Sequence, residues 1–273
     1  MSRRFRAAVV QLRASADKLA NLGKAESLVA AAATAGAKLI SLPEMFNLYG
    51  PFEPIVAAAE TIPGPTSNLL SQWAARHGVF LVGGSFAERD GAGSPTSDKA
   101  RNTSLLFAPD GRILARYCKV HLFDVDLPGR VTSNESDWIT AGGETTVTET
   151  PLAKIGQAIC YDLRFPELFR RLSADGAEVI VVPSAFTHTT GRDHWEILVR
   201  ARAIENQCYV LAPNQCGEPA PGMRTYGHSM IVDPWGRVLA SLEEEEGFAV
   251  AELDLDALAQ VRAQLPTHAH RRL

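Results

Sequence analysis

The sequence predicts an α/β fold in which two similar halves stack sheet against sheet, as a four-layer αββα sandwich with helices outside. The first observation behind this prediction is a repeat. "AGAKLISLPEMF" (35–46) returns as "DGAEVIVVPSAF" (175–186), each with a small-residue turn, a buried-type strand, a proline and a phenylalanine. The second is a similarity of pattern between "HGVFLVGGSF" (77–86) and "NQCYVLAPNQ" (206–215). Both pairs occur in the same order along the chain, which indicates two related halves.

The third observation is a pair of predicted strand hairpins. "NTSLLFAPDGRILARY" (102–117) matches "GHSMIVDPWGRVLASL" (227–242), and in each a Pro-x-Gly turn joins two strands. Helical patterns rich in alanine or charge lead into the first repeat of each half, "ADKLANLGKAESLVAAAATAG" (16–36) and "FPELFRRLSADG" (165–176). The alternation of helices with apolar, β-branched strands is typical of α/β proteins.

Composition limits the classes of protein that this chain can be. Its 273 residues, 46% hydrophobic and 21% charged, can bury a large core, and we expect a single domain over residues 1–273. With only four cysteines the chain is not a disulfide scaffold. It is not an integral membrane protein either, because no apolar stretch approaches the roughly 20 residues that a membrane span needs. A net charge of −4 offers no basic field for nucleic acid. The amino terminus "MSRRFRAAVVQL" enters a predicted strand without a leader-type apolar segment, so we expect a cytoplasmic protein.

Cys160 is the first candidate for chemistry. "AKIGQAIC" (153–160) reads as a buried strand, and a helix with Pro166 in its first turn follows. At such a strand-to-helix turn, backbone N–H groups of the helix would lower the pKa of the thiol and could bind an oxyanion. Core packing is the alternative, because free cysteine is among the most buried residue types.

Two further polar residues follow predicted strands. Glu44 ends "KLISLPEMF" at the same carboxyl edge that bears Cys160 in the other half, which is where α/β sheets bind ligands. Lys119, in "ARYCKVHLFDVD", follows another strand and could stabilise the oxyanion of a tetrahedral intermediate. A capping or surface role is the alternative for the glutamate and a solvated surface charge for the lysine. None of the seven histidines is singled out by its setting as the base of a Cys-His dyad.

With these residues the chain closely resembles the nitrilase superfamily of carbon-nitrogen hydrolases, whose three motifs match "LPEMF", "YCKVHLFD" and "CYDLRFPELFR" in order. The resemblance runs from about residue 5 to about residue 255 and implies the αββα sandwich. It carries the catalytic triad of the family onto Glu44, Lys119 and Cys160, and the frequent second glutamate onto Glu135 in "TSNESDW".

The resemblance implies a thiol-dependent amidase that works through a thioester on Cys160. In that mechanism Glu44 takes the thiol proton, while Lys119 and the backbone N–H of Tyr161 stabilise the oxyanion. No metal or other cofactor is expected, because no Cys or His cluster has ligand spacing. The Gly-rich "LVGGSFAERDGAGS" (81–94) lacks a phosphate-binding fingerprint, and we interpret it as a hairpin loop.

Two segments point to a branch of the superfamily. True nitrilases usually carry Trp-Glu after the cysteine, whereas "CYDLRFPE" is similar to the Nit branch of amidases. The segment "SAFTHTTGRDHWEILVRARAIENQCYVLAPNQCG" (184–217) resembles Nit amidases that split deaminated glutathione into 2-oxoglutarate and Cys-Gly, a metabolite-repair reaction. Pro213 and Asn214 stand where many animal members have alanines.

Three alternatives remain at this point. The first is ω-amidase activity on 2-oxoglutaramate, and the second is a non-catalytic binding module on the same fold, although such a module should have lost a triad residue. The third is a thiol redox protein, which would want a resolving cysteine near Cys160.

A substrate with a 2-oxo acid end brings a carboxylate, and an arginine near the nucleophile would bind it. Arg164 is one candidate, although a salt bridge would also explain it, and Arg192 in the predicted loop "THTTGRDHW" (187–195) could pair with the terminal glycine carboxylate. Further candidates for lining the pocket, each with packing or local contacts as the alternative, are Tyr49, Phe186, Thr187 and Thr190.

We also expect a homodimer or a larger homo-oligomer. The predicted helix "FPELFRRLSADG" carries more apolar side chains than one sheet face obviously needs, and the branch commonly pairs through this region. Packing of these side chains into the core is the alternative. They are Phe165, Leu168, Phe169 and Leu172.

Overall fold

The computed structural model describes residues 3–89 and 98–272. Its first sheet has seven strands in the order β17-β1-β2-β3-β5-β4, with β6 also paired to β5. Strands β1, β2 and β3 run parallel, so each connection between them crosses over through helix on one face. The strands are β1 (Arg4–Gln11), β2 (Ala37–Ser41), β3 (Phe80–Val82), β4 (Phe86–Glu88), β5 (Arg101–Phe107), β6 (Ile113–Cys118) and β17 (Gly247–Asp254). The helices of this half are α1 (Lys18–Thr34), α2 (Phe52–Ala57) and α3 (Pro65–His77).

The second sheet has six strands in the order β16-β15-β12-β11-β10-β9, again with a parallel centre. Its strands are β9 (Thr146–Glu149), β10 (Lys154–Gln157), β11 (Val179–Val181), β12 (Tyr209–Ala212), β15 (Met230–Val232) and β16 (Val238–Ser241). Helices α4 (Pro166–Ala174) and α5 (His188–Asn206) cover it, and α6 (Leu255–Gln264) and α7 (Thr267–His270) form the carboxyl end. The remaining elements are the pairs β7 (Asp124–Leu127) with β8 (Val131–Asn134) and β13 (Cys216–Gly217) with β14 (Thr225–Tyr226), and the 3-10 turns η1 (Glu135–Asp137) and η2 (Cys160–Arg164).

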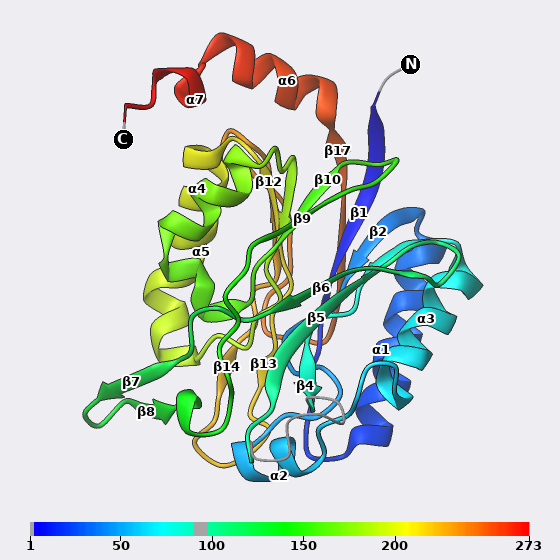
Figure 1. Ribbon diagram of the computed structural model, residues 1–273, viewed down its shortest axis with the longest axis vertical. Coiled ribbons are helices and arrows are strands. Elements are labelled where there is room, and N and C mark those ends of the chain that lie inside the picture. The colour runs from blue at the N-terminus through cyan, green and yellow to red at the C-terminus, as the bar shows by residue number, and fades with distance from the viewer. Residues whose placement is uncertain (1–2, 90–97, 273) are drawn as a thin grey trace.

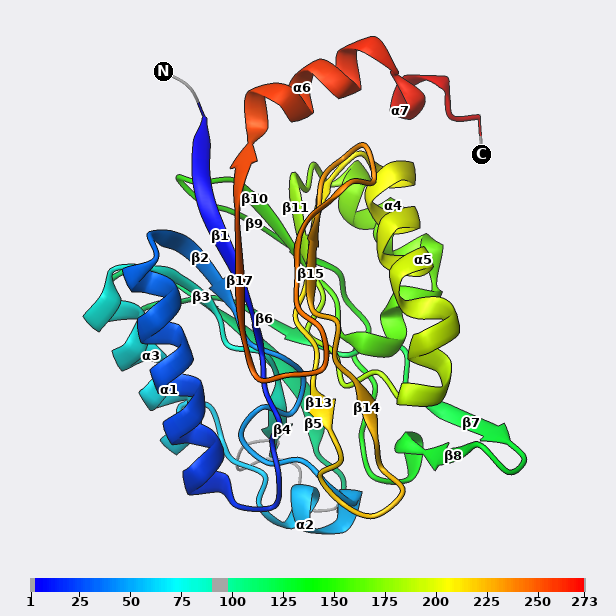
Figure 2. The same cartoon turned by 180° about the vertical axis from the view of Figure 1, so that it is seen from behind.

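The topology repeats between the halves, as the sequence predicts. The path β1-β2-β3-β5-β6 corresponds to β10-β11-β12-β15-β16, and an antiparallel strand flanks the first member of each path, β17 beside β1 and β9 beside β10. In Figures 1 and 2, α1 and α3 lie outside one sheet and α4 and α5 outside the other. The four-layer prediction is therefore confirmed.

Three buried clusters show the layers from the side chains. One cluster joins the facing sheets and includes Val9 and Leu39 from the first half and Ile155, Val179 and Leu211 from the second. The other two lie between each sheet and its own helices. Parallel strands that are apolar on both faces need a covering layer on each side. Here the other sheet covers one face and the helices cover the other. Within the described residues, no helix has the length and apolar character to cross a membrane.

The structure corrects two local predictions. Residues 188–195 are not a loop but the first turns of α5, where Gly191 lets the helix approach Tyr226 so closely that a Cβ would lie 2.4 Å from the Cβ of the tyrosine. This packing outweighs the weak helix propensity of the Thr-rich segment. The hairpin loop predicted over 81–94 is corrected in part where it is described: the segment includes the end of β3 and the whole of β4, and β4 then pairs antiparallel with β5, the next strand along the chain. Residues 90–97 lie outside the described part of the chain.

The apolar residues of α4 do not form a surface. Leu168, Phe169 and Leu172 are buried between α4 and the second sheet, and the ring of Phe165 stacks on His121 with 3.7 Å between ring centroids. The side chains from which we inferred an intersubunit surface therefore pack inside a single chain, as the alternative of core packing predicts.

Candidate active site

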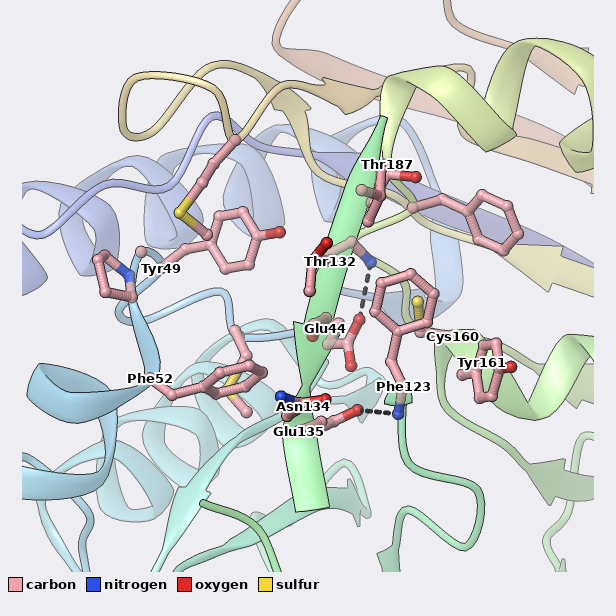
Figure 3. A pocket seen from close by; sticks show the side chains of 18 of the residues that line it. Glu44, Tyr49, Phe52, Phe123, Thr132, Asn134, Glu135, Cys160, Tyr161 and Thr187 are labelled. Atoms are coloured by element: carbon pink, nitrogen blue, oxygen red, sulfur yellow. Dashed lines mark hydrogen bonds between the residues drawn. The ribbon is translucent and has the colours of Figure 1, made fainter. Parts of the chain in front are cut away.

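The three residues of the predicted triad meet at the carboxyl ends of strands from both sheets. Glu44 follows β2 and Lys119 follows β6 in the first half, whereas Cys160 follows β10 in the second. All three line one cavity of about 720 Å³, in which Figure 3 labels Glu44 and Cys160, yet they are only 4%, 2% and 8% exposed. Two of the three, Glu44 and Lys119, are charged; charged groups this deeply buried need partners, and these two form an ion pair with each other.

Both halves hold the carboxylate of Glu44. Its Oε1 accepts from Lys119 Nζ at 2.9 Å, and its Oε2 accepts from the backbone N–H of Ala185 at 2.9 Å. The side chain of Gln215 also donates to the Glu44 backbone carbonyl at 2.9 Å. The carboxylate is therefore fixed in direction before any substrate arrives, as a positioned general base must be.

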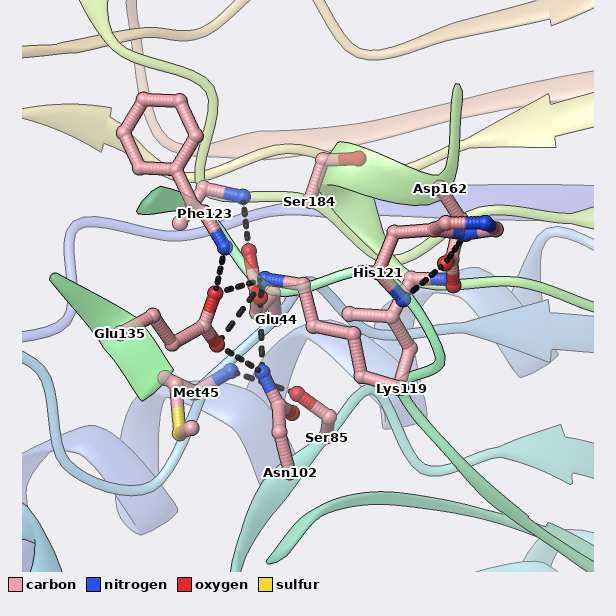
Figure 4. Close-up of polar contacts among 12 residues, drawn as sticks. Glu44, Met45, Ser85, Asn102, Lys119, His121, Phe123, Glu135, Asp162 and Ser184 are labelled. Atoms are coloured by element: carbon pink, nitrogen blue, oxygen red, sulfur yellow. Dashed lines mark hydrogen bonds and ion pairs between the residues drawn. The ribbon is translucent and has the colours of Figure 1, made fainter. Parts of the chain in front are cut away.

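Lys119 lies between two carboxylates (Figure 4). Its Nζ is 2.9 Å from Glu44 Oε1 and 2.8 and 3.0 Å from the two oxygens of Glu135. Burial by itself lowers the pKa of this ammonium, but the charges of Glu135 and Glu44 outweigh burial and hold the pKa of Lys119 well above its usual range. The lysine is consequently a fixed positive charge at neutral pH.

Glu135 and Asn102 complete this polar cluster. Glu135, on η1, is 2% exposed and also accepts from the backbone N–H of Phe123 at 2.7 Å. Asn102, at the start of β5, donates through Nδ2 to Glu44 Oε1 at 2.8 Å and to Glu135 Oε1 at 3.4 Å. Asn102 was not identified as a site residue from the sequence. The one feature that could have indicated it is a polar residue at the start of an apolar strand.

Cys160 occupies a backbone conformation that few residues other than glycine adopt. Its φ is +45°, and its N–H donates to the carbonyl of Pro183 at 2.9 Å. Burial first, and then the charge of Glu44, raise the pKa of the thiol well above its usual range. The thiol therefore stays protonated until a base removes the proton.

The expectation of a lowered thiol pKa was thus wrong. The turn η2 separates the cysteine from α4, and α4 begins at Pro166, which has no N–H to offer. Desolvation acts on the buried sulfur directly and the helix end does not.

The cavity is also lined by Tyr161, whose backbone N–H is the predicted partner of the oxyanion, and by most of the predicted substrate-binding residues. Tyr161 lies in the first turn of η2, where backbone N–H groups have no partner within the helix. The guanidinium of Arg164 lies over the ring of Phe186, 5.0 Å from its centroid, and burial lowers the pKa of this arginine. Among the residues that the structure describes, no carboxylate pairs with Arg164.

Tyr49, Thr187 and Thr190 also belong to the lining, and Arg192 does not. Burial and the nearby Glu44 raise the pKa of Tyr49 well above its usual range, so its hydroxyl stays protonated at the cavity wall. The hydroxyls of Thr187 and Thr190 lie 2.8 Å apart. Arg192 points to solvent from α5, with its side chain 70% exposed and paired with Asp193. The structure therefore places Arg192 outside the cavity, whereas Thr190 on the same helix lines it.

No site for a metal ion emerges from residues 3–89 and 98–272. In these ranges, no group of three or more His, Cys, Asp or Glu side chains is placed to hold one.

A buried thiol beside a fixed carboxylate and a fixed ammonium, at the joint edge of two stacked sheets, defines a thiol-dependent hydrolase of the αββα class. The model of the carbon-nitrogen hydrolase family matches residues 6–263, and the chain belongs to this family.

Relatives are similar over nearly the whole chain. It is 44% identical over 269 residues to the deaminated glutathione amidase of Synechocystis sp. strain PCC 6803, covering 98% of each chain. It is 42% identical over 269 residues to the omega-amidase NIT2 of Danio rerio, covering 98% of this chain and 95% of the relative. The crystal structure of the NitFhit protein of C. elegans matches with a TM-score of 0.91 at 38% identity, over 98% of this chain and 65% of that chain. The predicted Nit-branch resemblance is confirmed.

Proposed function

We propose that this hydrolase cleaves the amide bond of deaminated glutathione, with Cys160 as nucleophile, Glu44 as proton carrier and Lys119 as the oxyanion-stabilising cation. The observation that carries the proposal is that Glu44 binds Lys119 at 2.9 Å and lines the same cavity as Cys160, where its charge acts on the thiol. A base, a nucleophile and a cation are the minimum set for acyl transfer through a thiol.

Acylation follows from these positions. Glu44 takes the Sγ proton as the sulfur attacks the amide carbon, and the carbonyl oxygen becomes an oxyanion beside Lys119 Nζ and the Tyr161 N–H. Glu44, now protonated, gives that proton to the leaving nitrogen as the carbon–nitrogen bond breaks. Cys-Gly departs as a neutral amine, and the 2-oxo acid remains as a thioester on Cys160.

Deacylation uses the same groups again. Glu44 removes a proton from a water molecule, whose oxygen attacks the thioester carbon while Lys119 again faces the oxyanion. Collapse of this second tetrahedral species breaks the carbon–sulfur bond, returns the proton to Sγ and releases 2-oxoglutarate. Glu135 holds Lys119 between two carboxylates during both steps.

The choice of substrate rests on the charge and size of the cavity. Arg164, half-buried and without a carboxylate partner in the described residues, suits the carboxylate of the 2-oxo acid end. At about 720 Å³ the cavity lies in the usual range for a ligand larger than 2-oxoglutaramate. Arg130, at the β7–β8 turn, also lines it and takes the place of Arg192 as the candidate for the terminal glycine carboxylate. The relatives support both activities, so 2-oxoglutaramate remains the second candidate.

The experiment is a comparison of kcat/KM on the two compounds. Release of Cys-Gly from deaminated glutathione and of ammonia from 2-oxoglutaramate would be followed at the same enzyme concentration. We expect activity on both and a higher kcat/KM on deaminated glutathione. An equal or higher value on 2-oxoglutaramate would favour the omega-amidase alternative, and Arg130→Ala should reduce the preference several-fold if an exposed ion pair carries it.

We also propose a cytoplasmic homodimer. Its four cysteines are free thiols, as expected in a reducing compartment. The outer face of α5 exposes Ile197 (69%) and Ile204 (50%), and the turn that bears Trp235 (57% exposed) packs beside Ile204. An exposed apolar patch of this kind favours association. A monomeric mass by light scattering at micromolar concentration would contradict the dimer.

A further inference from the structure

Asp162, two residues after Cys160, is a buried carboxylate that lies outside the cavity lining and accepts four hydrogen bonds. Its Oδ2 accepts from the Tyr117 hydroxyl at 2.6 Å and from the backbone N–H of Ile159 at 2.8 Å. Its Oδ1 accepts from the backbone N–H of His121 at 3.0 Å and from the Nδ1 of that ring at 2.7 Å. A fully desolvated carboxylate is stable only with such a set of donors.

These partners flank the candidate catalytic residues in both halves of the fold. Tyr117 and His121 stand two residues before and two residues after Lys119, at the end of β6 in the first half. Asp162 belongs to η2, which begins at Cys160 in the second half. One side chain therefore ties the segment that carries the lysine to the turn that carries the cysteine, and Figure 4 shows this contact beside the polar cluster of Lys119.

The turn at Cys160 needs such support. A residue with a side chain at φ +45° is held in a sparsely populated conformation, which persists only where the surroundings enforce it. The bond from Ile159 N–H to the Asp162 carboxylate closes the turn on one side of the cysteine, and the Asp162 N–H returns a bond to the Ile159 carbonyl at 3.0 Å.

The groups that donate hydrogen bonds to Asp162 keep both their protons and their positions. Burial, followed by the charge of Asp162, raises the pKa of the Tyr117 hydroxyl well above its usual range, so the hydroxyl always donates. The His121 ring stacks flat on Phe165, with an angle of 6° between the rings. The cluster is thus satisfied and packed, which makes it a rigid support.

We propose that Asp162, with Tyr117 and His121, is a positioning cluster that holds the Cys160 turn in register with Lys119 and Glu44. None of the three touches the reacting atoms, and they act through the geometry of the nucleophile. The proposal rests on the proposed function in one respect, that Cys160 is the nucleophile.

The test compares two conservative variants that each remove one buried hydroxyl. Tyr117→Phe deletes a donor to Asp162. Tyr209→Phe is the matched control, since Tyr209 is 4% exposed and its hydroxyl bonds only to the backbone of Asp254, at 3.0 Å, in the described residues. Each variant is measured for Tm, for kcat and KM on deaminated glutathione and 2-oxoglutaramate, and for the rate at which iodoacetamide alkylates Cys160, read by peptide mass spectrometry.

We expect both variants to lose a similar amount of Tm, and Tyr117→Phe alone to lose about tenfold in kcat with KM within twofold, the effect of one hydrogen bond to a charged acceptor. Alkylation of Cys160 should slow in the same proportion. The proposal is overturned if Tyr117→Phe matches Tyr209→Phe in kcat, if KM rises as much as kcat falls, or if alkylation is as fast as in the parent.

A second pair of variants checks the other donor. His121→Asn keeps an N–H near the position of Nδ1 and should retain more kcat than His121→Leu, which keeps none. Equal kcat in the two would contradict a role through Asp162. If the parent hydrolyses neither amide, the proposed substrates fail, and the alkylation rates of Tyr117→Phe and Tyr209→Phe still decide the role of the cluster.

Discussion

Replacing Lys119 by methionine keeps most of the length of the side chain and removes its charge. Lys119 is 2% exposed and contacts Glu44 and Glu135 within 3.0 Å, so the substitution leaves two buried carboxylates without their shared cation. Removing one partner of a buried ion pair costs about 3–5 kcal/mol of stability. Loss of an oxyanion-stabilising group costs about a hundred- to a thousandfold in kcat. We expect both effects in Lys119→Met.

The two effects can be separated with a second substitution. Glu135→Gln removes the surplus negative charge from the Lys119→Met background while keeping the shape of the side chain. The double variant should recover part of the lost free energy of unfolding, measured in urea, but none of the kcat. Lys119→Arg should also be poorly active, because a planar fork does not replace a compact ammonium between two carboxylates.

Two results would refute this reasoning. Turnover of Lys119→Met within a few-fold of the parent would make Lys119 a structural charge. Recovery of kcat in the double variant would mean that charge balance, and not a cation at the oxyanion, is what catalysis needs.

Other substitutions test the remaining groups. Cys160→Ala should fold yet lose nearly all turnover and the acyl adduct seen by intact mass, and substantial activity would exclude the thioester route. Asn102→Leu removes a hydrogen-bond donor from Glu44 and Glu135, so kcat should fall about tenfold, the effect of one hydrogen bond to a charged acceptor; an unchanged kcat would limit Asn102 to packing. Arg192→Ala should leave kcat/KM on deaminated glutathione within twofold, because Arg192 lies outside the cavity, and a larger loss would contradict the placement of α5. Burial raises the pKa of Cys208 to about 11, so above about pH 9 the thiol ionises in the unfolded chain before it ionises in the folded protein. The free energy of unfolding should therefore fall by about 2–3 kcal/mol between about pH 9 and pH 11. Urea unfolding at pH 8 and pH 11 should show a smaller loss of this free energy in Cys208→Ala than in the parent.

The sequence by itself determined the class of fold and the residues of the candidate triad. Buried strands and amphipathic helices leave a periodicity that can be read locally, and the same periodicity repeats in the two halves. Glu44, Lys119 and Cys160 could be found because each directly follows an apolar strand and lies in a motif of adjacent residues. Glu135 came from the family motif, since nothing in its own surroundings in the sequence separates it from other acidic loop residues.

Only the tertiary structure decided what depends on contacts between distant segments. Asn102 meets Glu44 and Glu135 across 58 and 33 residues, and Asp162 meets Tyr117 across 45, so no local pattern predicts which residues they contact. The raised pKa of Cys160 follows from burial and from Glu44, which arrives from the other half. Arg192 was assigned to the substrate because its polar segment read as a loop, whereas the packing of Gly191 against Tyr226 makes that segment helical and turns the arginine to solvent. Charge and accessibility are properties of the assembled cavity, and they are fixed only when the two sheets close on each other.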